Sequence, residues 1–203
     1  MKKFFLITLI IFTIDFFLSS FFLKNTAYWN NEQWPNKYYR IKSDIYHHDL
    51  MPNIEVVESW GGRLKRKIIT NSIGFRDQQQ NKINKISNKK RILLIGDSFI
   101  EGSGLDYQYT FAGLLKDKLG NRYEILNSAV ASYSPSIYFK KTEYYINEGY
   151  KFDQAIIFLD ISDIFDELFI EFDSMGNIKT YKENKYTYKF FHNWGIFKFM
   201  TMY

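Results

Sequence analysis

A serine that could act as a nucleophile stands at the end of an apolar run. Ile92–Ile95 is followed directly by Gly96, Asp97 and Ser98. Four consecutive aliphatic residues bounded by turn residues are typical of a strand that is buried on both faces of a parallel sheet. Ser98 is therefore expected on the loop just beyond the carboxyl end of a strand, which is where open α/β sheets place ligands and chemistry.

The spacing around Ser98 argues against three other motifs. The nucleophile elbow of α/β-hydrolases requires a glycine two residues after the serine, where this chain has Ile100. A phosphate-binding loop requires Gly-Lys-Ser/Thr after four spacer residues, and a dinucleotide-binding loop requires Gly-x-Gly-x-x-Gly. Neither of the last two patterns occurs in the sequence.

The elements expected after Ser98 alternate between helix and strand. Apolar residues at helical spacing predict a helix that Gly120 ends, and Pro135 is a favourable first residue for a second helix. The expected elements are a helix over Tyr109–Leu119, a strand over Tyr123–Leu126, a helix over Pro135–Glu148, a buried strand over Ala155–Leu159 and a hairpin over Glu171–Thr180. This alternation predicts a parallel sheet, and right-handed crossovers place the strand before Ser98 between the other two.

Composition limits the class of protein. The 203 residues suffice for an N-terminal appendage and one domain of roughly 110 to 150 residues. A formal charge of +5 suits an anionic membrane surface or a polyanionic glycan as well as nucleic acid, so charge alone does not choose among them. The absence of cysteine excludes disulfides and thiolate metal sites.

The N-terminus has the pattern of a membrane anchor. Lys2 and Lys3 precede Phe4–Leu23, in which Asp15 is the one charged residue. A helix of that length spans a bilayer, and no Ala-x-Ala-like cleavage site follows it. A mid-membrane carboxylate costs about 2.5 to 3.5 kcal/mol, which the surrounding apolar residues can offset. Because the lysines come first, the helix is expected to cross once and to leave the rest of the chain on the extracytoplasmic side.

Residues 25–90 contain few periodic segments and are expected to form an extracytoplasmic lead-in and linker. Lys67–Thr70 is predicted to be a short strand, whereas Gln78–Lys90 is polar and has no core-forming pattern. His47 and His48 beside Asp49 form the most metal-like cluster. Adjacent histidines point in different directions, so no metal site is expected and these side chains are assigned to a polar loop.

The Gly-Asp-Ser sequence after a strand resembles the first block of the SGNH (GDSL-like) hydrolase superfamily. Asn71–Asp77, which reads Asn-x-x-Gly-Phe-Arg-Asp, resembles a membrane-tethered subgroup that includes relatives of alginate-type O-acetyltransferases. The resemblance implies a three-layer, flavodoxin-like α/β fold with a parallel sheet, in which Ser98 is the nucleophile and Asp97 supports its loop. Gly74 would supply a tight turn, and Arg76 would be a fixed cation that either contacts substrate or forms a structural ion pair.

Two later segments resemble the second and third family blocks, with substitutions. Ser132 stands where the second block usually has a glycine, whose backbone N–H helps to hold the oxyanion. Ser162 replaces the asparagine of the third block, and Asp163 matches the acidic residue that follows it. The resemblance therefore assigns Ser132 and Ser162 to the oxyanion site and Asp163 to the third-block acid.

The last family block, Asp-x-x-His, supplies the base and the carboxylate that orients it, and it has no match here. The late histidine His192 has Lys189 three residues before it, so it does not fit. We therefore expect an SGNH fold that is incomplete at its C-terminus, in the N-terminal part of a longer protein. The expected boundaries are an anchor over 1–24, a lead-in over 25–90 and the SGNH-like domain over 91–203.

These residues predict a membrane-anchored serine esterase or O-acyltransferase that acts on acyl esters, such as those of cell-envelope glycans. No cofactor, metal or nucleic acid is expected to take part. The alternative is a non-catalytic module that retains the fold and binds an envelope glycan or a partner protein. The substitutions at Ser132 and Ser162 favour the module, whereas the intact Gly-Asp-Ser favours the enzyme.

Overall fold

The computed structural model describes residues 2–18, 39–60, 64–168 and 170–181, which belong to two compact units. The first contributes the helix α1 (Lys2–Leu18), and the second contains all the described residues from Tyr39 onward. Within these ranges, no helix combines the length and the apolar character that crossing a bilayer requires. The expected anchor Phe4–Leu23 extends beyond the described residues, so it stays a prediction.

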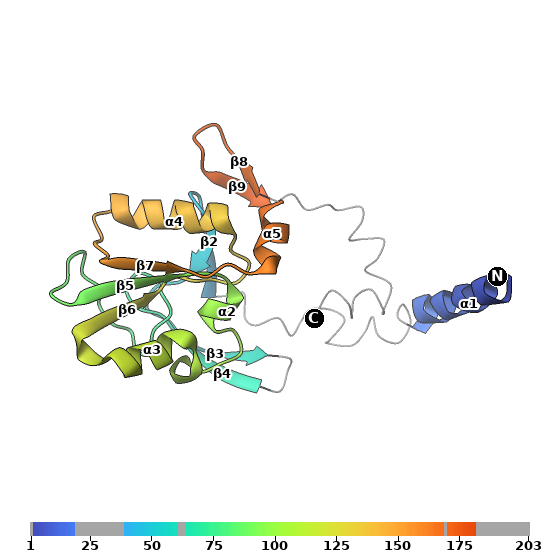
Figure 1. Ribbon diagram of the computed structural model, residues 1–203, viewed down its shortest axis with the longest axis horizontal. Coiled ribbons are helices and arrows are strands. Elements are labelled where there is room, and N and C mark those ends of the chain that lie inside the picture. Colours follow the sequence, from blue (N-terminus) through green and yellow to red (C-terminus); the bar gives the residue numbers. More distant parts are fainter. Residues whose placement is uncertain (1, 19–38, 61–63, 169, 182–203) are drawn as a thin grey trace. The chain divides into compact units, whose positions relative to one another are not determined.

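Three parallel strands form the central sheet of the larger unit (Figure 1). β5 (Lys90–Ile95) lies between β6 (Tyr123–Asn127) and β7 (Gln154–Ile157), and Leu93 of β5 pairs with Leu126 of β6. The parallel direction and the central place of the strand before Ser98 confirm the prediction from the sequence.

The helices follow the strands in the expected order. The elements after β5 are α2 (Ser98–Glu101), the 3₁₀ turn η3 (Tyr107–Tyr109), α3 (Phe111–Leu119), the 3₁₀ turn η4 (Gly120–Arg122), α4 (Pro135–Asn147) and α5 (Ile161–Glu167). Gly120 ends α3 and Pro135 begins α4, as their conformational preferences predict. The described residues therefore form an α/β protein.

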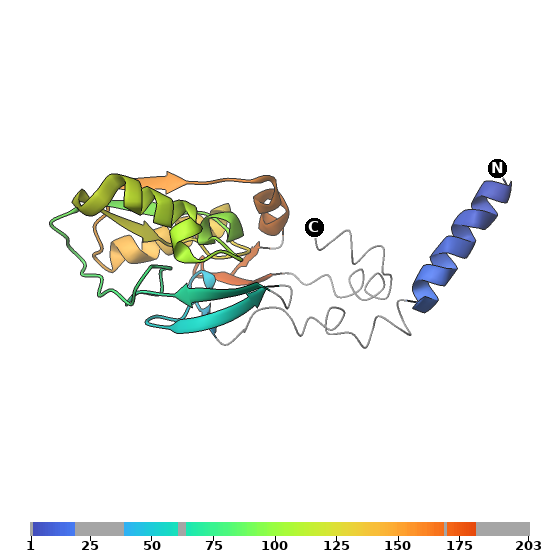
Figure 2. The ribbon, with the colours of Figure 1, turned by 90° about the horizontal axis from the view of Figure 1, so that it is seen from below.

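The two faces of β5 belong to different hydrophobic clusters, because alternate side chains of a strand point to opposite faces. Ile92 and Leu94 pack in the cluster that α3 joins, whereas Leu93 and Ile95 pack in the cluster that α4 joins. Figures 1 and 2 show α3 and α4 on opposite sides of the sheet. Burial of β5 on both faces is what its unbroken aliphatic run predicts.

β7 departs from the buried strand expected over Ala155–Leu159. All four residues of β7 are exposed, and the side chains of Ile157 and Leu159 are 57% and 67% accessible. β7 pairs with β5 along one edge, and no other described strand pairs with it. The prediction of burial is wrong here, because an apolar run is buried only where neighbouring elements cover it.

The expected lead-in contributes strands to the same compact unit. Two antiparallel pairs are formed by β1 (Arg40–Ser43) with β2 (His47–Leu50) and by β3 (Glu55–Trp60) with β4 (Leu64–Ile69). Six buried residues from this stretch join the cluster on the α4 side of the sheet: Tyr39, Tyr46, Leu50, Ile68, Phe75 and Ile83. The unit thus includes residues well before position 91, and even the polar stretch 78–90 supplies a core side chain.

The hairpin expected over Glu171–Thr180 is present as β8 (Ile170–Phe172) and β9 (Ile178–Tyr181). Gly176 takes φ +77° in its turn, a conformation that glycine adopts without strain. Ile178 pairs with Tyr46 by an isolated parallel bridge, so the hairpin is connected to the N-terminal strands.

Candidate active site

Ser98 is the first residue of α2, just beyond the carboxyl end of β5 (Figure 1). The Asp97 side chain caps α2 by accepting a hydrogen bond from the backbone N–H of Phe99 at 2.9 Å. The Ser98 hydroxyl donates to the other carboxylate oxygen of Asp97 at 3.2 Å. Ser98 is partly exposed whereas Asp97 is buried, so the hydroxyl lies at the boundary between core and solvent.

Three carboxylates meet at this end of the sheet. One carboxylate oxygen from each of Asp97, Asp160 and Asp163 lies within 4.8 Å of the others. Asp160 caps α5 by accepting from the Ser162 N–H at 2.6 Å, and Asp163 accepts from the Asp160 N–H at 3.1 Å. This reciprocal capping box fixes the first turn of α5, where Asp160 and Asp163 lie close to Asp97.

The carboxylates give the site a negative potential. Burial raises the pKa of Asp97, and the nearby charges of Asp160 and Asp163 raise it further, although the hydrogen bond from Phe99 opposes them. Burial alone would also raise the pKa of Asp160, but hydrogen bonds from Ser162 hold it below its usual value. A negative potential disfavours a developing oxyanion, so backbone N–H groups would have to supply its stabilisation.

The loop after β6, which holds the residues that resemble the second block, is bound to α2. The Glu101 carboxylate accepts hydrogen bonds from the Ala131 N–H at 2.5 Å and from the Arg40 guanidinium at 2.8 and 3.1 Å. The Asn127 side-chain amide donates to the Ile100 carbonyl at 2.8 Å. The structure therefore brings the first block into contact with both the second and the third.

Ser132 is exposed in this loop and has φ +64°. The glycine that the family resemblance implies at this position would adopt that angle without strain. A residue with a Cβ incurs a cost of roughly 1 to 2 kcal/mol in the left-handed region. The substitution therefore leaves a backbone N–H in place but adds both strain and a side chain at the loop.

The Ser162 hydroxyl is already used within α5. Its Oγ donates to Asp160 at 2.5 Å, alongside the hydrogen bond from its own backbone N–H to the same oxygen. An oxyanion donor would need the same hydroxyl hydrogen. In this conformation Ser162 serves the cap of α5.

Arg76 braces the loop that follows α2. Its side chain is 1% exposed, and its guanidinium donates to the carbonyl oxygens of Glu101 at 2.6 Å, Gly102 at 2.5 Å and Leu105. The sequence left open a substrate contact or a structural ion pair for Arg76. Because these backbone carbonyls accept the hydrogen bonds of the guanidinium, Arg76 positions the segment that follows Ser98.

The tight turn expected at Gly74 is present, and Asn71 stabilises it. The side-chain oxygen of Asn71 accepts hydrogen bonds from the N–H groups of Ile73 and Phe75, and its backbone carbonyl accepts from the Gly74 N–H at 3.0 Å. Gly74 has φ +81°, and a Cβ there would lie 2.5 Å from the carbonyl oxygen of Leu50. Both the backbone angle and the close approach require glycine.

His48 supports the second-block loop from β2. Its Nε2 lies 2.9 Å from the Ala131 carbonyl oxygen, which can only accept, so Nε2 carries the hydrogen. Its Nδ1 lies 2.7 Å from Nδ1 of His47. Burial lowers the pKa of His48 to about 3, which keeps the ring neutral near pH 7. Both ring nitrogens are engaged, so His48 acts here as a support of the loop.

Lys141 is a second support that the sequence analysis missed. Its buried ammonium donates to Asp49 at 2.7 Å, to the Ser128 carbonyl at 2.8 Å and to the Tyr133 hydroxyl at 3.1 Å. Burial lowers the pKa of Lys141, and the Asp49 carboxylate opposes that shift. The sequence does contain a signal of this burial, because Lys141 lies four residues after the apolar Ile137 and so on the same face of α4.

The described residues define an α/β protein with a serine and three carboxylates at the carboxyl edge of a parallel sheet. No family model matches the chain, and no curated protein is similar to it. The SGNH resemblance thus stays a prediction. His192, which the sequence does not favour as a base, lies outside the described residues.

Proposed function

We propose that the chain is a membrane-anchored, SGNH-type serine esterase or O-acyltransferase whose nucleophile is Ser98. The observation that carries the proposal is the place of Ser98: partly exposed, at the first position of α2, beyond the central strand of a parallel sheet. Loops at this edge of open α/β sheets commonly hold the chemistry.

In the proposed reaction, Ser98 Oγ attacks the acyl carbonyl carbon and loses its proton, and the substrate alcohol leaves with a proton. The resulting acyl-enzyme is then attacked by water in an esterase or by a sugar hydroxyl in a transferase, which restores Ser98. Asp97 accepts the hydrogen bond of the Ser98 hydroxyl at 3.2 Å, and its raised pKa makes it a stronger base than an ordinary carboxylate. Backbone N–H groups at Ser98 and Ser132 are the oxyanion donors of this proposal.

Serine-directed phosphonates provide the test. We expect a fluorescent alkylphosphonate to label the chain, and Ser98→Ala to abolish the labelling. Ser103→Ala is the matched control, because Ser103 lies in the turn just after α2 and is also partly exposed. Equal labelling of the Ser98→Ala variant would contradict the proposal.

The proposal places the reactive serine outside the cytoplasm, on a chain anchored by Phe4–Leu23. It is supported by the lysines that precede this apolar run. A reporter that is active only after export, fused behind Tyr203, is expected to be active. A signal from a reporter that requires the cytoplasm would contradict the orientation.

A non-catalytic glycan-binding or partner-binding module is the second candidate. The observation that favours it is the engagement of the Ser162 hydroxyl with Asp160, which withdraws a donor from the proposed oxyanion site. Binding assays on acetylated and deacetylated polysaccharide separate the two candidates. Retention that requires the acyl group, without release of free acid over time, would support the module.

A further inference from the structure

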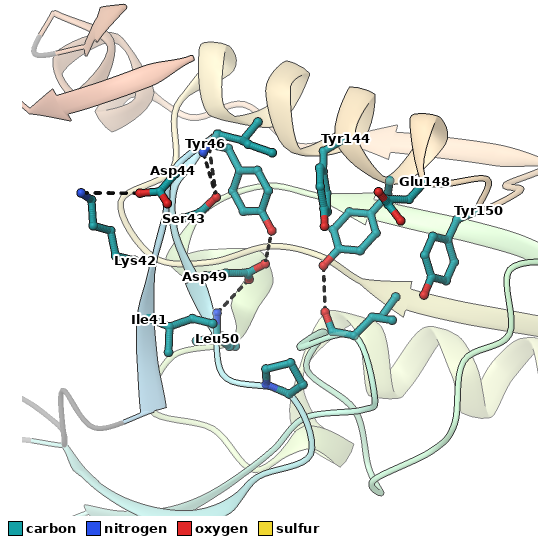
Figure 3. A pocket seen from close by; sticks show the side chains of 14 residues that line it. Ile41, Lys42, Ser43, Asp44, Tyr46, Asp49, Leu50, Tyr144, Glu148 and Tyr150 are labelled. Carbon is teal, nitrogen blue, oxygen red and sulfur yellow. Dashed lines mark hydrogen bonds and ion pairs between the residues drawn. The ribbon is translucent and has the colours of Figure 1, made fainter. Parts of the chain in front are cut away.

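A pocket of about 460 Å³ lies between β1, β2 and the last turns of α4 (Figure 3). We call it the tyrosine pocket. α4 begins after the carboxyl end of β6 and leads back to the amino end of β7, so its last turns point toward the sheet edge opposite Ser98. The volume falls in the range of roughly 300 to 1,000 Å³ that is common for small-molecule sites.

Four tyrosine rings form one continuous wall of this pocket. Tyr46 and Tyr144 have ring centroids 5.6 Å apart, Tyr144 and Tyr145 are 5.1 Å apart, and Tyr145 and Tyr150 are 5.5 Å apart. Figure 3 shows Tyr46, Tyr144 and Tyr150 along the pocket beneath α4. Tyr144 and Tyr150 are partly exposed, so these two rings are accessible to a ligand.

The tyrosine hydroxyls divide into two kinds. The Tyr46 hydroxyl donates to Asp49 at 2.9 Å, and the Tyr145 hydroxyl donates to the Ile73 carbonyl at 2.8 Å. Within the described part of the chain, the hydroxyls of Tyr144 and Tyr150 make no hydrogen bond to protein groups. Two phenol groups therefore remain to donate to a ligand or to accept from it.

The charges around the tyrosine pocket are balanced. Each of its three carboxylates lies within 4 Å of a lysine ammonium: Asp44 and Lys42 at 3.7 Å, Glu148 and Lys85 at 3.5 Å, and Asp49 and Lys141 at 2.7 Å. With every carboxylate matched by a cation, the pocket offers little net attraction to an ion. The carboxylate oxygens still have lone pairs that can accept hydrogen bonds from neutral hydroxyl groups.

We propose that the tyrosine pocket binds a neutral sugar unit of a glycan. The apolar C–H face of a pyranose ring would pack on Tyr144 or Tyr150, while its hydroxyls would bond to the two phenols and to the Glu148 carboxylate. Aromatic walls, hydroxyl partners and balanced charge together fit this class of ligand better than an ion. The proposal is independent of the chemistry at Ser98, because none of the residues proposed to react or to hold the oxyanion lines this pocket.

Calorimetric titration of the full chain with N,N′-diacetylchitobiose and with cellobiose tests the proposal. The chain is kept in a sugar-free zwitterionic detergent, and tetramethylammonium and glucuronate serve as charged probes. We expect saturable binding of at least one neutral disaccharide that is tighter than the binding of either charged probe. Failure of both disaccharides to bind, or tighter binding of a charged probe, overturns the proposal.

Variants locate the binding. Tyr150→Ala should weaken disaccharide binding by about fivefold or more, since loss of one aromatic contact typically removes about 1 kcal/mol. Tyr109→Ala is the matched control, because Tyr109 is 62% exposed and lines a different pocket. Unchanged affinity in Tyr150→Ala overturns the proposal.

A measurement without substitution covers the case in which Tyr150→Ala fails to fold. Saturation transfer from the protein to the disaccharide should be strongest at the C–H protons of one sugar face, and ring resonances of Tyr144 and Tyr150 should shift. Shifts confined to other residues overturn the proposal. Ser98→Ala should keep the disaccharide affinity, so failure of the proposed chemistry at Ser98 is distinguishable from failure of this site.

Discussion

Replacement of Lys141 by methionine tests how the second-block loop is held. Methionine retains most of the aliphatic stem of lysine and removes the ammonium, which is buried and donates to Asp49, the Ser128 carbonyl and Tyr133. The variant thus leaves the Asp49 carboxylate buried without its cation.

The expected cost follows from the burial of this pair. The side chains of Lys141 and Asp49 are 3% and 6% exposed, so solvent cannot replace the lost ammonium. Removal of one member of a buried ion pair typically costs about 3 to 5 kcal/mol. The free energy of unfolding of a domain is typically about 5 to 15 kcal/mol, so Lys141→Met should lower the urea midpoint substantially.

Equilibrium urea unfolding, followed by circular dichroism, measures this cost. Lys140→Met is the matched control, because Lys140 lies beside Lys141 on α4 but forms a more exposed pair with Glu143, and it should change stability by less than about 0.5 kcal/mol. Adding Asp49→Asn to Lys141→Met should cost less than the two single effects combined, by at least about 1 kcal/mol. A loss of under about 1 kcal/mol in Lys141→Met would refute the role assigned to the buried pair.

Two further predictions concern the same loop. Ser132→Gly should stabilise the chain by about 0.5 to 1 kcal/mol, because relief of the strain at φ +64° exceeds the entropy cost of glycine. Ser132→Ala keeps the Cβ and should not stabilise the chain. Equal urea midpoints for the two variants would contradict the strain argument. His48 has a folded-state pKa of about 3, below its unfolded value of 6.5, so the unfolded chain binds more protons between these values and stability is lost as the pH falls. The stability advantage of the natural chain over His48→Gln should therefore shrink below pH 6.5, by up to about 1.4 kcal/mol per pH unit, and a pH-independent difference would contradict the burial of a neutral ring.

Local sequence signals were sufficient for the parallel sheet and its helices. The run Ile92–Ile95 is long enough and apolar enough to be buried on both faces, and Gly120 and Pro135 mark helix ends by their own backbone preferences. Each of these signals acts within a few residues. The aliphatic run of β7 is a signal of the same kind, yet β7 is exposed, because burial also depends on which elements cover a strand.

Local patterns predicted the end of β4, as the short strand expected over Lys67–Thr70, but not the other strands before residue 90. β1 and β4 carry charged side chains at alternate or adjacent positions, and the apolar residues of these segments reach the core singly. Ile83, for example, is buried within a polar stretch that has no periodicity of its own. Such positions are determined by long-range packing, which one sequence does not display.

The position of Ser98 followed from the sequence, whereas the residues around it required the fold. Asp97 and Asp160 are far apart in the chain and meet because β5 and β7 are parallel neighbours. Glu101 could have been singled out, since an acidic residue one turn after the nucleophile is buried in α2. Its partners Arg40 and Ala131 come from segments that no motif connects to it.

The N-terminal strands hold the second-block loop in place. Arg40 of β1 binds Glu101, which in turn accepts from the Ala131 N–H, and His48 of β2 donates to the Ala131 carbonyl. Both hydrogen-bonding groups of Ala131 are thus fixed, one residue before the strained Ser132. Because a preorganised backbone donor must be held before the oxyanion forms, residues that look like a linker in the sequence lie at the base of the proposed chemistry. The same hydrogen bonds would also keep the loop rigid in a binding module, so they support a specific site at this edge of the sheet in either case. The Ser98 labelling experiment decides between a catalytic site and a binding site.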